Sequence, residues 1–327
     1  MTLRIGIIGA GHMGRTHAKI LVQDKRVEVV GIVDIVLQNA IRLADEIGSR
    51  AFPSLDALLD EGIDALYVTT PNTQHREPVL KALDAGLHVF SEKPMATTLA
   101  EAAEVLNAAK NSKGIYQLGF NYRFAPVHQL AKKMIDGGSL RPFHVHIKDN
   151  RGELIDPPWV GNPKLTGGYL YESTIHTLDL IQYLLGEIKT FEVVSRSNLY
   201  PELDDFALLF EFCNGSIATL DSCAHASWLY PAGAIEIFGD HATLLTEEMD
   251  RVRYTTGLGQ EIITYDYSQY PQPYRWGYVE EDRLFIDAVM EGTPSVVPAE
   301  DGYRVTELID ALYHCGVRPE KGQETVS

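Results

Sequence analysis

Short apolar runs alternate with amphipathic segments from residue 3 to residue 120. The apolar runs predict buried strands at Leu3–Ile8, Val27–Val33, Ala65–Thr70, Leu87–Phe90 and Ile115–Phe120. Helical periodicity or capping signals fall between them, at Arg15–Val22, Leu37–Ile47, Ser54–Leu59, Thr73–Ala85 and Thr98–Lys113. Strands that alternate with helices at this spacing predict a doubly wound parallel sheet of the Rossmann type.

The pattern changes after Phe120. Beyond a helix over Pro126–Ile135, strands follow one another directly, and the runs on either side of Asn214-Gly215 carry the strongest hairpin signal in the chain. Three more segments have helical periodicity: Thr174–Leu185, Val279–Met290 and Ala299–Cys315. We therefore expect a first domain over residues 1–121 and an α+β domain over residues 122–327. The second should hold an open, mainly antiparallel sheet with flanking helices, of which the last can pack back on the first domain.

Length, charge and cysteine content narrow the class. A chain of 327 residues can form two cores, and a formal net charge of -17 disfavours nucleic acid or an anionic membrane as partner. No apolar stretch approaches the length of a membrane span, and no secretory signal pattern precedes the first strand. Three cysteines without metal-ligand spacing fit a reducing compartment, so we expect a cytoplasmic protein.

The first strand ends in Gly9-Ala10-Gly11-His12-Met13-Gly14, a Gly-x-Gly-x-x-Gly motif followed at once by a helix. Gly9 permits a tight turn, Gly11 lets the backbone approach a pyrophosphate, and Gly14 lets helix and strand pack closely. Asp34 ends the next strand, where a carboxylate meets the ribose hydroxyls of NAD and repels the 2′-phosphate of NADP. The alternative is an ordinary βα turn with chance glycines and an Asp that caps a helix. The combination of the glycine motif with Asp34 favours an NAD-binding site over an ordinary βα turn.

Lys93 lies directly after a buried strand, in Glu92-Lys93-Pro94. The ligand crevice of an open α/β sheet runs along the carboxyl ends of its strands, so this lysine can reach a bound cofactor. Pro94 keeps Lys93 out of helical geometry, and a cis bond between the two residues would aim the side chain. A solvated surface lysine is the competing interpretation.

Glu172 and His176 are four residues apart near the start of a predicted helix. On a helix they would share a face, and a carboxylate beside an imidazole raises its pKa and orients it as a general base. The alternative is an acid at a helix start next to a packed, satisfied histidine. His17, on the first helix, is interpreted as a packing residue.

The order of these motifs, with Gly167-Gly168 before His176 and Gly119–Arg123 after a strand, resembles the glucose–fructose oxidoreductase / inositol dehydrogenase / rhizopine-catabolism (Gfo/Idh/MocA) family. The resemblance spans nearly the whole chain. It implies NAD(P)-dependent redox chemistry on a sugar or cyclitol, and dimers or tetramers that associate through the open sheet. It also implies that Lys93 and His176 are catalytic, with Glu172 at a position where the family usually has Asp.

Further site residues follow from position and resemblance. The turn amides of His12 and Met13, and Ile35 beside Asp34, are expected to contact NAD. By resemblance, five further residues are expected along the cofactor. Four follow the strand Ala65–Thr70 or end it, and the fifth is the acid of Glu92-Lys93-Pro94: Thr70, Pro71, Asn72, His75 and Glu92. For the substrate we expect hydrogen bonds from Asn121, Tyr122, Arg123 and Arg151, and an aromatic surface from Trp159, with loop packing as the alternative. No metal site is predicted, because His144 and His146 alone are too few ligands.

Two other functions fit the same motifs. An NAD-dependent glycosidase would oxidise its substrate only transiently, and a nucleotide-sensing regulator would bind NAD without turnover. Retention of both Lys93 and His176 disfavours the regulator, and net NADH production would separate a dehydrogenase from a glycosidase. No compact Arg/Lys cluster indicates a phosphorylated substrate.

Overall fold

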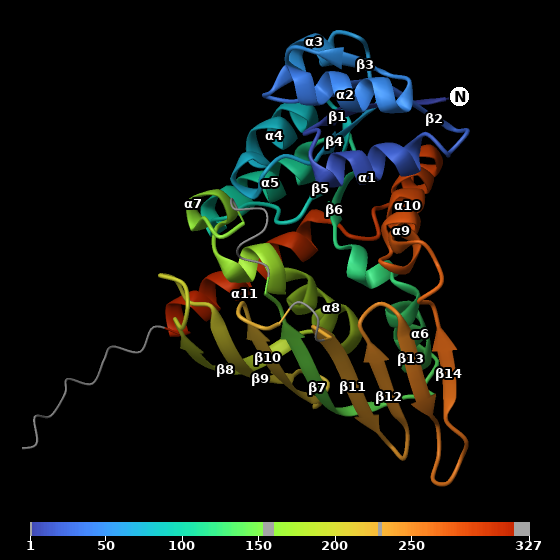
Figure 1. The fold of residues 1–327 in the computed structure, drawn as a ribbon, viewed down its shortest axis with the longest axis vertical. Helices are drawn as coiled ribbons and strands as arrows, with labels where there is room; N and C mark the ends of the chain where they lie inside the picture. The colour runs from blue at the N-terminus through green and yellow to red at the C-terminus, as the bar shows by residue number, and fades with distance from the viewer. Residues whose placement is uncertain (1, 153–159, 228–230, 317–327) are drawn as a thin grey trace, which may run out of the picture.

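Two β-sheets, one above the other in Figure 1, organise the chain. The computed structural model describes residues 2–152, 160–227 and 231–316. Within that part of the chain, no helix combines the length and apolar character needed to cross a bilayer.

The first sheet is parallel, with six strands in the order β3-β2-β1-β4-β5-β6. Its strands are β1 (Leu3–Ile8), β2 (Val27–Val33), β3 (Arg50–Phe52), β4 (Ala65–Val68), β5 (His88–Glu92) and β6 (Tyr116–Gly119). The strand order reverses between β1 and β4, which is the point where open α/β sheets bind ligands.

Helices separate these strands as the alternating pattern predicts. They are α1 (His12–Leu21), α2 (Leu37–Ile47), α3 (Leu55–Leu59), the short helix η1 (Asn72–Gln74), α4 (Arg76–Asp84) and α5 (Leu99–Asn111). One buried cluster joins Ile5, Ile7 and Leu21 to Phe285 and Ile286, which come from α10 near the end of the chain. The first sheet therefore shares a core with a helix that follows the second sheet.

The second sheet is mixed and mostly antiparallel, with eight strands in the order β14-β13-β12-β11-β7-β10-β9-β8. Its strands are β7 (Pro142–Asn150), β8 (Ile188–Arg196), β9 (Asp205–Phe212), β10 (Ile217–Cys223), β11 (Gly233–Gly239), β12 (Thr243–Glu247), β13 (Arg251–Thr255) and β14 (Ile263–Asp266). The hairpin predicted at Asn214-Gly215 joins β9 to β10, and β10 pairs parallel with β7. The predicted fold class is confirmed.

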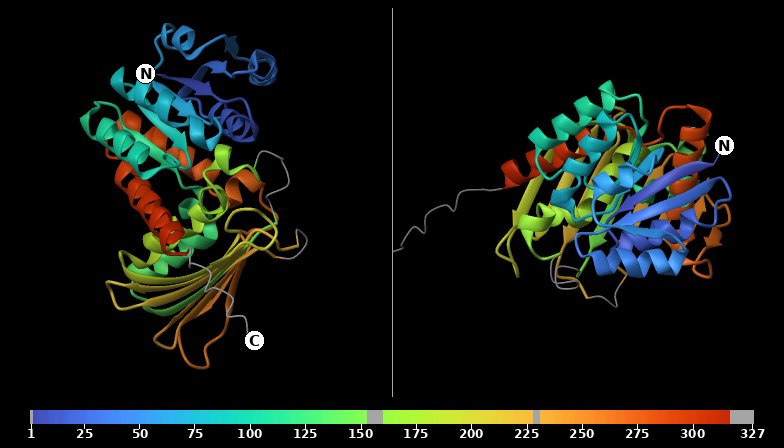
Figure 2. Two further views of the ribbon diagram at one scale, coloured as in Figure 1. Left: turned by 90° about the vertical axis from the view of Figure 1, so that its left-hand side faces the viewer. Right: turned by 90° about the horizontal axis from the view of Figure 1, so that it is seen from above.

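The remaining helices lie mainly between the two sheets (Figure 2). They are η2 (Asn121–Phe124), α6 (Pro126–Asp136), α7 (Pro163–Thr166), η3 (Leu170–Thr174), α8 (Ile175–Leu185), α9 (Gln272–Arg275), α10 (Tyr278–Glu291) and α11 (Ala299–Gly316). They cover one face of the second sheet, whereas among the described residues no helix covers the other. His144 and His146 project from that other face and are exposed, as predicted.

Candidate active site

The glycine turn between β1 and α1 is held by the loop after β4. Thr69 donates its hydroxyl to the carbonyl of Gly9 at 2.8 Å. Gly9 has a φ of +101°, and a Cβ there would lie 2.5 Å from the Thr69 carbonyl oxygen. A Cβ on Gly14 would lie 1.9 Å from the Gly9 carbonyl oxygen. Two of the three motif glycines are therefore required by the packing of the turn itself.

Gly11 differs from its neighbours. Its φ of -74° is open to any residue, and a Cβ there would meet no atom within 4 Å. Among the described residues, no neighbouring atom requires glycine at position 11. The missing side chain therefore leaves the backbone of the turn accessible to a ligand. His12 and Met13 begin α1, where the amides of the first turn have no intrahelical acceptor and attract a phosphate. The turn fits the pyrophosphate of NAD.

Asp34 lies at the end of β2 with a fixed carboxylate. It accepts hydrogen bonds from the amides of Ala10 and Val36, both at 2.8 Å, and from the Asn39 side chain at 3.3 Å. The same carboxylate thus joins the glycine turn to the start of α2. Ile35 is 95% exposed beside it, which leaves an apolar side chain available to the adenosine half of the cofactor.

The loop after β4 only partly follows expectation. Pro71 is exposed and Thr70 half-buried, but Asn72 and His75 are buried and engaged by the protein. Asn72 donates to the Thr166 carbonyl at 3.0 Å and to the Glu172 carboxylate at 2.8 Å. The ring nitrogens of His75 lie 2.7 Å from the carbonyl oxygens of Thr70 and Pro94. We therefore reassign Asn72 and His75 from cofactor contact to holding loops in place.

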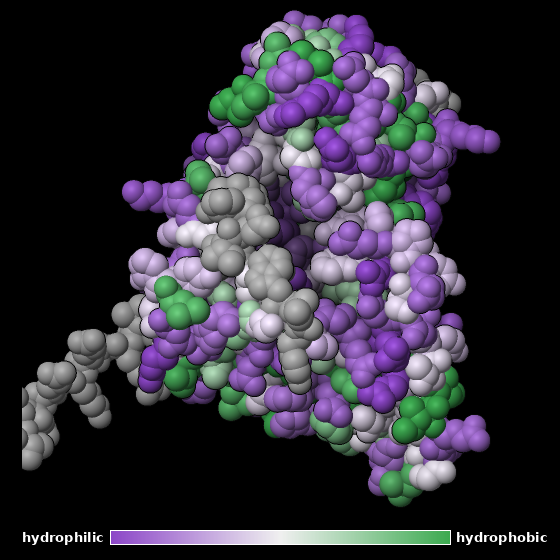
Figure 3. Space-filling view, in the orientation of Figure 1, coloured by the Kyte–Doolittle hydropathy of each residue, from purple (hydrophilic) through white to green (hydrophobic). Residues whose placement is uncertain are grey.

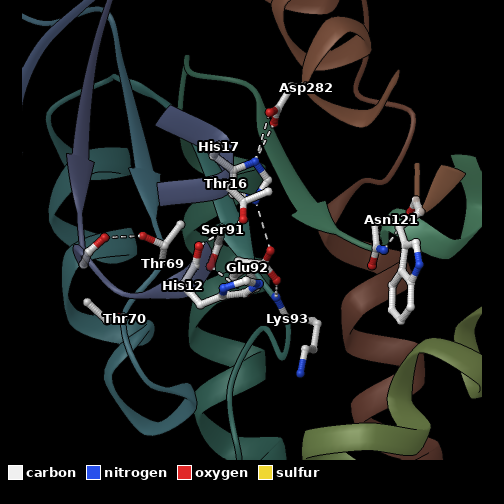
Figure 4. Close-up of polar contacts among 12 residues, drawn as sticks. His12, Thr16, His17, Thr69, Thr70, Ser91, Glu92, Lys93, Asn121 and Asp282 are labelled. Carbon is white, nitrogen blue, oxygen red and sulfur yellow. Dashed lines mark hydrogen bonds and ion pairs between the residues drawn. The ribbon is translucent and has the colours of Figure 1, made fainter. Parts of the chain in front are cut away.

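Lys93 extends from the end of β5 toward the second domain (Figure 4). Its ammonium donates to the Glu172 carbonyl at 2.7 Å and lies 3.9 Å from the Glu172 carboxylate. The peptide bond from Lys93 to Pro94 is cis, as hypothesised from the sequence. Glu92 was expected along the cofactor, but its side chain is buried and bound by the protein. Its carboxylate accepts from His17 and from the Lys93 amide, both at 3.1 Å.

The predicted pairing of Glu172 with His176 is wrong in its geometry. The residues belong to successive helical segments, the π-helical turn η3 and the helix α8. The Glu172 carboxylate is directed to Asn72 and Lys93 instead. Among the described residues, no carboxylate raises the pKa of His176. Burial, followed by the positive charges of Lys93 and Arg151, lowers that pKa well below the ordinary value.

Tyr122 orients His176 where a carboxylate was expected. The two rings are stacked with centroids 4.6 Å apart and planes at 18°, and Phe120 packs edge-on against the imidazole at 6.4 Å. Arg151 donates to the Tyr122 hydroxyl and, through its Nε, to Asp149 at 3.1 Å. His176 is thus a neutral imidazole at neutral pH, held by aromatic packing beside two cations, which suits a general base.

Asn121 and Arg123 do not act as expected. Asn121 is 1% exposed and donates to the Trp276 carbonyl at 2.8 Å. Arg123 is buried and donates to Asp179 at 2.5 and 2.7 Å and to Asp301 at 2.7 Å. A buried guanidinium paired with two carboxylates holds helices together, so both residues are corrected to structural roles. Trp159 lies outside the described residues.

The cofactor turn and Lys93 belong to the first domain, whereas His176 belongs to the second. Figure 3 shows a hollow on the face where these domains meet, and its visible walls are hydrophilic. Among the described residues, no group of three His, Cys, Asp or Glu side chains is arranged to hold a metal ion.

Comparison with known proteins agrees with this geometry. Residues 3–120 match the oxidoreductase family with an NAD-binding Rossmann fold, and residues 132–315 match the C-terminal alpha/beta domain of the same family, Gfo/Idh/MocA. The chain belongs to this oxidoreductase family. The resemblance inferred from the motifs is confirmed, and the chain is an NAD-binding oxidoreductase.

Individual relatives cover most or about half of the chain. Myo-inositol 2-dehydrogenase of Thermotoga maritima is 28% identical over 314 residues, 92% of this chain and 92% of its own. Glucose-6-phosphate 3-dehydrogenase of Bacillus subtilis is 36% identical over 187 residues, 55% of this chain and 53% of its own. The crystal structure of GenD2 from gentamicin A biosynthesis, in complex with NAD, is 25% identical with a TM-score of 0.84 and covers 96% of this chain and 94% of that one.

Sequence reasoning missed one residue with a larger part in this region. His17 was interpreted as a packing residue, yet it lies between two buried carboxylates, those of Glu92 and Asp282. The available signal was polar residues at apolar positions, because His17 lies on the buried side of α1 and Asp282 on the buried side of α10.

Proposed function

We propose that this oxidoreductase is an NAD-dependent dehydrogenase that oxidises a secondary alcohol of a sugar or cyclitol. The observation that carries the proposal is the position of the His176 ring, buried and stacked on Tyr122 within electrostatic reach of the Lys93 ammonium, where burial and this charge lower the pKa of His176. An oxidation that removes a hydroxyl proton needs an uncharged base and a cation near the same oxygen. The two residues supply both.

Each residue has a distinct role in the proposed step. His176 accepts the hydroxyl proton of the substrate, and Lys93 donates a hydrogen bond to the same oxygen as negative charge develops there. NAD supplies the hydride acceptor. Glu172 accepts from Asn72 and, through its carbonyl, from Lys93, so it keeps the ammonium directed at the site rather than orienting His176. Arg151 and Tyr122 are proposed to bind neighbouring hydroxyls.

The substrate class is supported by the names of the relatives. One is a myo-inositol 2-dehydrogenase and another a glucose-6-phosphate 3-dehydrogenase, both of which act on ring hydroxyls. The described part of the site presents Arg151 already engaged with Asp149 and Tyr122. We therefore propose an uncharged polyol rather than a sugar phosphate.

A panel assay tests this function. The protein and NAD are incubated with inositols, aldoses, anhydro-sugars, amino sugars, sugar phosphates and glycosides, and NADH and products are quantified. The proposal expects NADH and ketone in equal amounts from at least one uncharged polyol. Release of an aglycone without NADH accumulation would establish the glycosidase. Tight NAD binding without turnover on any substrate would favour the regulator.

The open sheet face is proposed to join copies of the chain. Ile217 of β10 lies in register with His144 of β7, which pairs with Phe238 of β11, and all three side chains are exposed. Leu209 adds a further exposed apolar side chain on β9. Light scattering of the wild type and of Ile217→Lys tests this arrangement. A dimer or tetramer that dissociates in the variant supports it, and a wild-type monomer contradicts it.

A cytoplasmic location is proposed because Cys213, Cys223 and Cys315 are unpaired.

A further inference from the structure

A buried histidine connects the lysine loop to the last third of the chain. His17 on α1 is 0% exposed and is enclosed by the rings of Phe90 at 4.9 Å, Tyr67 at 5.6 Å and Tyr278 at 6.0 Å. Its Nδ1 lies 2.9 and 3.0 Å from the two carboxylate oxygens of Asp282 on α10. Its Nε2 lies 3.1 Å from a carboxylate oxygen of Glu92 at the end of β5. Figure 4 shows the three side chains in a row.

The contacts of this row favour a doubly protonated His17, because a neutral ring would need one of the two buried acids to carry a proton. Each ring nitrogen faces a carboxylate, and a neutral imidazole can donate from only one nitrogen. The doubly protonated ring satisfies both contacts while both acids stay ionised. Burial alone would lower the pKa of His17, but Asp282 and Glu92 together raise it well above the ordinary value. The row therefore holds one positive and two negative charges away from water.

Glu92 transmits this arrangement to the catalytic lysine. One carboxylate oxygen of Glu92 faces His17, and the other accepts the main-chain N–H of Lys93 at 3.1 Å. Burial raises the pKa of Glu92, but His17 and Lys93 together lower it below the ordinary value. An ionised Glu92 holds the Lys93 amide more strongly than a protonated one would.

We propose that His17 is a positioning residue. As a buried imidazolium it fixes Glu92, and through the Lys93 main chain it places the Lys93 ammonium for the proposed oxidation. Because the second partner of His17 is Asp282, the position of Lys93 depends on the packing of α10. The catalytic relevance rests on the proposed function, whereas the link between His17 and the Lys93 main chain does not.

Other titratable groups around His17 are compatible with this role. From β4 it is faced by Tyr67, and from α10 by Tyr278 and Glu281 besides Asp282. Neither oxygen of the buried Glu281 carboxyl has a hydrogen-bond partner, and burial raises its pKa well above the ordinary value. Burial thus favours the neutral form of Glu281, and both tyrosines, with pKa values raised above the ordinary value, are neutral. The charges that act on His17 are those of Glu92 and Asp282.

Nuclear magnetic resonance of the whole protein tests the link without a substrate. Ring ¹⁵N signals of His17, assigned by their loss in His17→Gln, are followed with pH together with the Lys93 amide, assigned by Lys93→Arg. We expect an imidazolium at pH 7.5. In Asp282→Asn the His17 midpoint should fall by at least about one pH unit, and the Lys93 amide should shift with the same midpoint.

The matched control is Asp287→Asn. Asp287 also joins α10 to the α1 side, through Arg26 at 2.7 Å, but it has no contact with the row. The Asp287→Asn variant should be less stable than the wild type, but neither the His17 ring signals nor the Lys93 amide signal should shift. A neutral His17 ring at pH 7.5, or a Lys93 amide that is unaffected when His17 titrates, would overturn the proposal.

Kinetics on the polyol identified by the panel provide a second readout. Loss of the His17 proton should lower kcat, so the alkaline fall in kcat should begin at a lower pH in Asp282→Asn than in the wild type or Asp287→Asn. At pH 8 we expect kcat to be about tenfold lower, with recovery near pH 6 and little change in the KM for NAD. An equal loss of kcat at every pH would overturn the catalytic relevance. If the panel yields no substrate, the proposed function fails while the magnetic resonance experiment still decides the link to Lys93.

Discussion

The glycine turn and the Lys93–His176 pair are the two parts of the proposed active site, and they are built differently. The turn is fixed by its own backbone and by Thr69 and Asp34, which follow the two strands on either side of β1, β4 and β2. The proposed catalytic pair is assembled across domains, because the Lys93 ammonium is held by the carbonyl of Glu172 and the His176 ring is stacked on Tyr122. We therefore expect the affinity for NAD to depend on local backbone geometry, whereas the rate of turnover should depend on the contact between the domains.

The largest loss is expected at the base. His176→Asn should lower kcat by about 10² to 10⁴-fold while the Kd for NAD stays within about twofold, because the imidazole moves the substrate proton and does not touch the glycine turn. Steady-state kinetics and NAD titration check this split. A parallel loss of NAD affinity would mean that the two regions are not separate.

The pH dependence of the wild type sharpens this prediction. His176 must be neutral to act, and its pKa lies below the ordinary value of 6.5. On the acid side, activity should therefore fall as the pH drops through that lowered pKa, and this acid limb should vanish in His176→Asn. The same sign holds for folding. The unfolded chain binds a proton near pH 6.5 and the folded site does not, so this group destabilises the fold as the pH falls below that value. An acid limb above pH 6.5 would contradict the assignment.

Two glycines of the turn should separate folding from binding. Gly14→Ala places a Cβ 1.9 Å from a backbone oxygen, and we expect it to destabilise the fold by about 3 kcal/mol. Gly11→Ala meets no protein atom within 4 Å and should leave stability within about 0.5 kcal/mol, while the Kd for NAD rises about tenfold. Thermal unfolding and calorimetric titration distinguish them. Unchanged NAD affinity in Gly11→Ala would remove the reason for glycine there.

A smaller effect is expected on cofactor choice. Asp34→Asn keeps an acceptor for only one of the amides of Ala10 and Val36, which bind different oxygens of the Asp34 carboxylate, and it removes the charge that repels a 2′-phosphate. The preference for NAD over NADP, measured as the ratio of kcat/KM values, should fall about tenfold. The control is Asp45→Asn, an exposed acid on α2 that should leave the ratio unchanged. A wild type that prefers NADPH would refute the role given to Asp34.

Features with a local cause could be predicted from the sequence. The alternation of strands and helices, the glycine turn and the Asn214-Gly215 hairpin follow from periodicity and turn chemistry, and all are present. Lys93 could be singled out because a strand end is recognisable from its own neighbours.

Side-chain partners distant in sequence could not be predicted. Asn72 reaches Glu172 across 100 positions, Arg123 reaches Asp301 across 178, and His17 reaches Asp282 across 265. A polar residue that binds a partner inside the protein has the same sequence neighbours as a polar residue that binds a ligand. Asn72, His75, Asn121 and Arg123 were therefore assigned to ligands, although protein groups already satisfy them. His176 was paired with Glu172 because i,i+4 spacing does not reveal which way a carboxylate turns.

Replacement of Lys93 tests the central claim most directly. NAD-saturated wild type and Lys93→Ala are mixed rapidly with the polyol identified by the panel, and the rate of NADH formation in a single turnover is compared with the Kd for NAD of each protein. We expect the rate to fall by at least about 10²-fold while the Kd changes by less than about threefold. Near-normal NADH formation in Lys93→Ala would contradict the proposed role of the lysine and, with it, the division between the two regions.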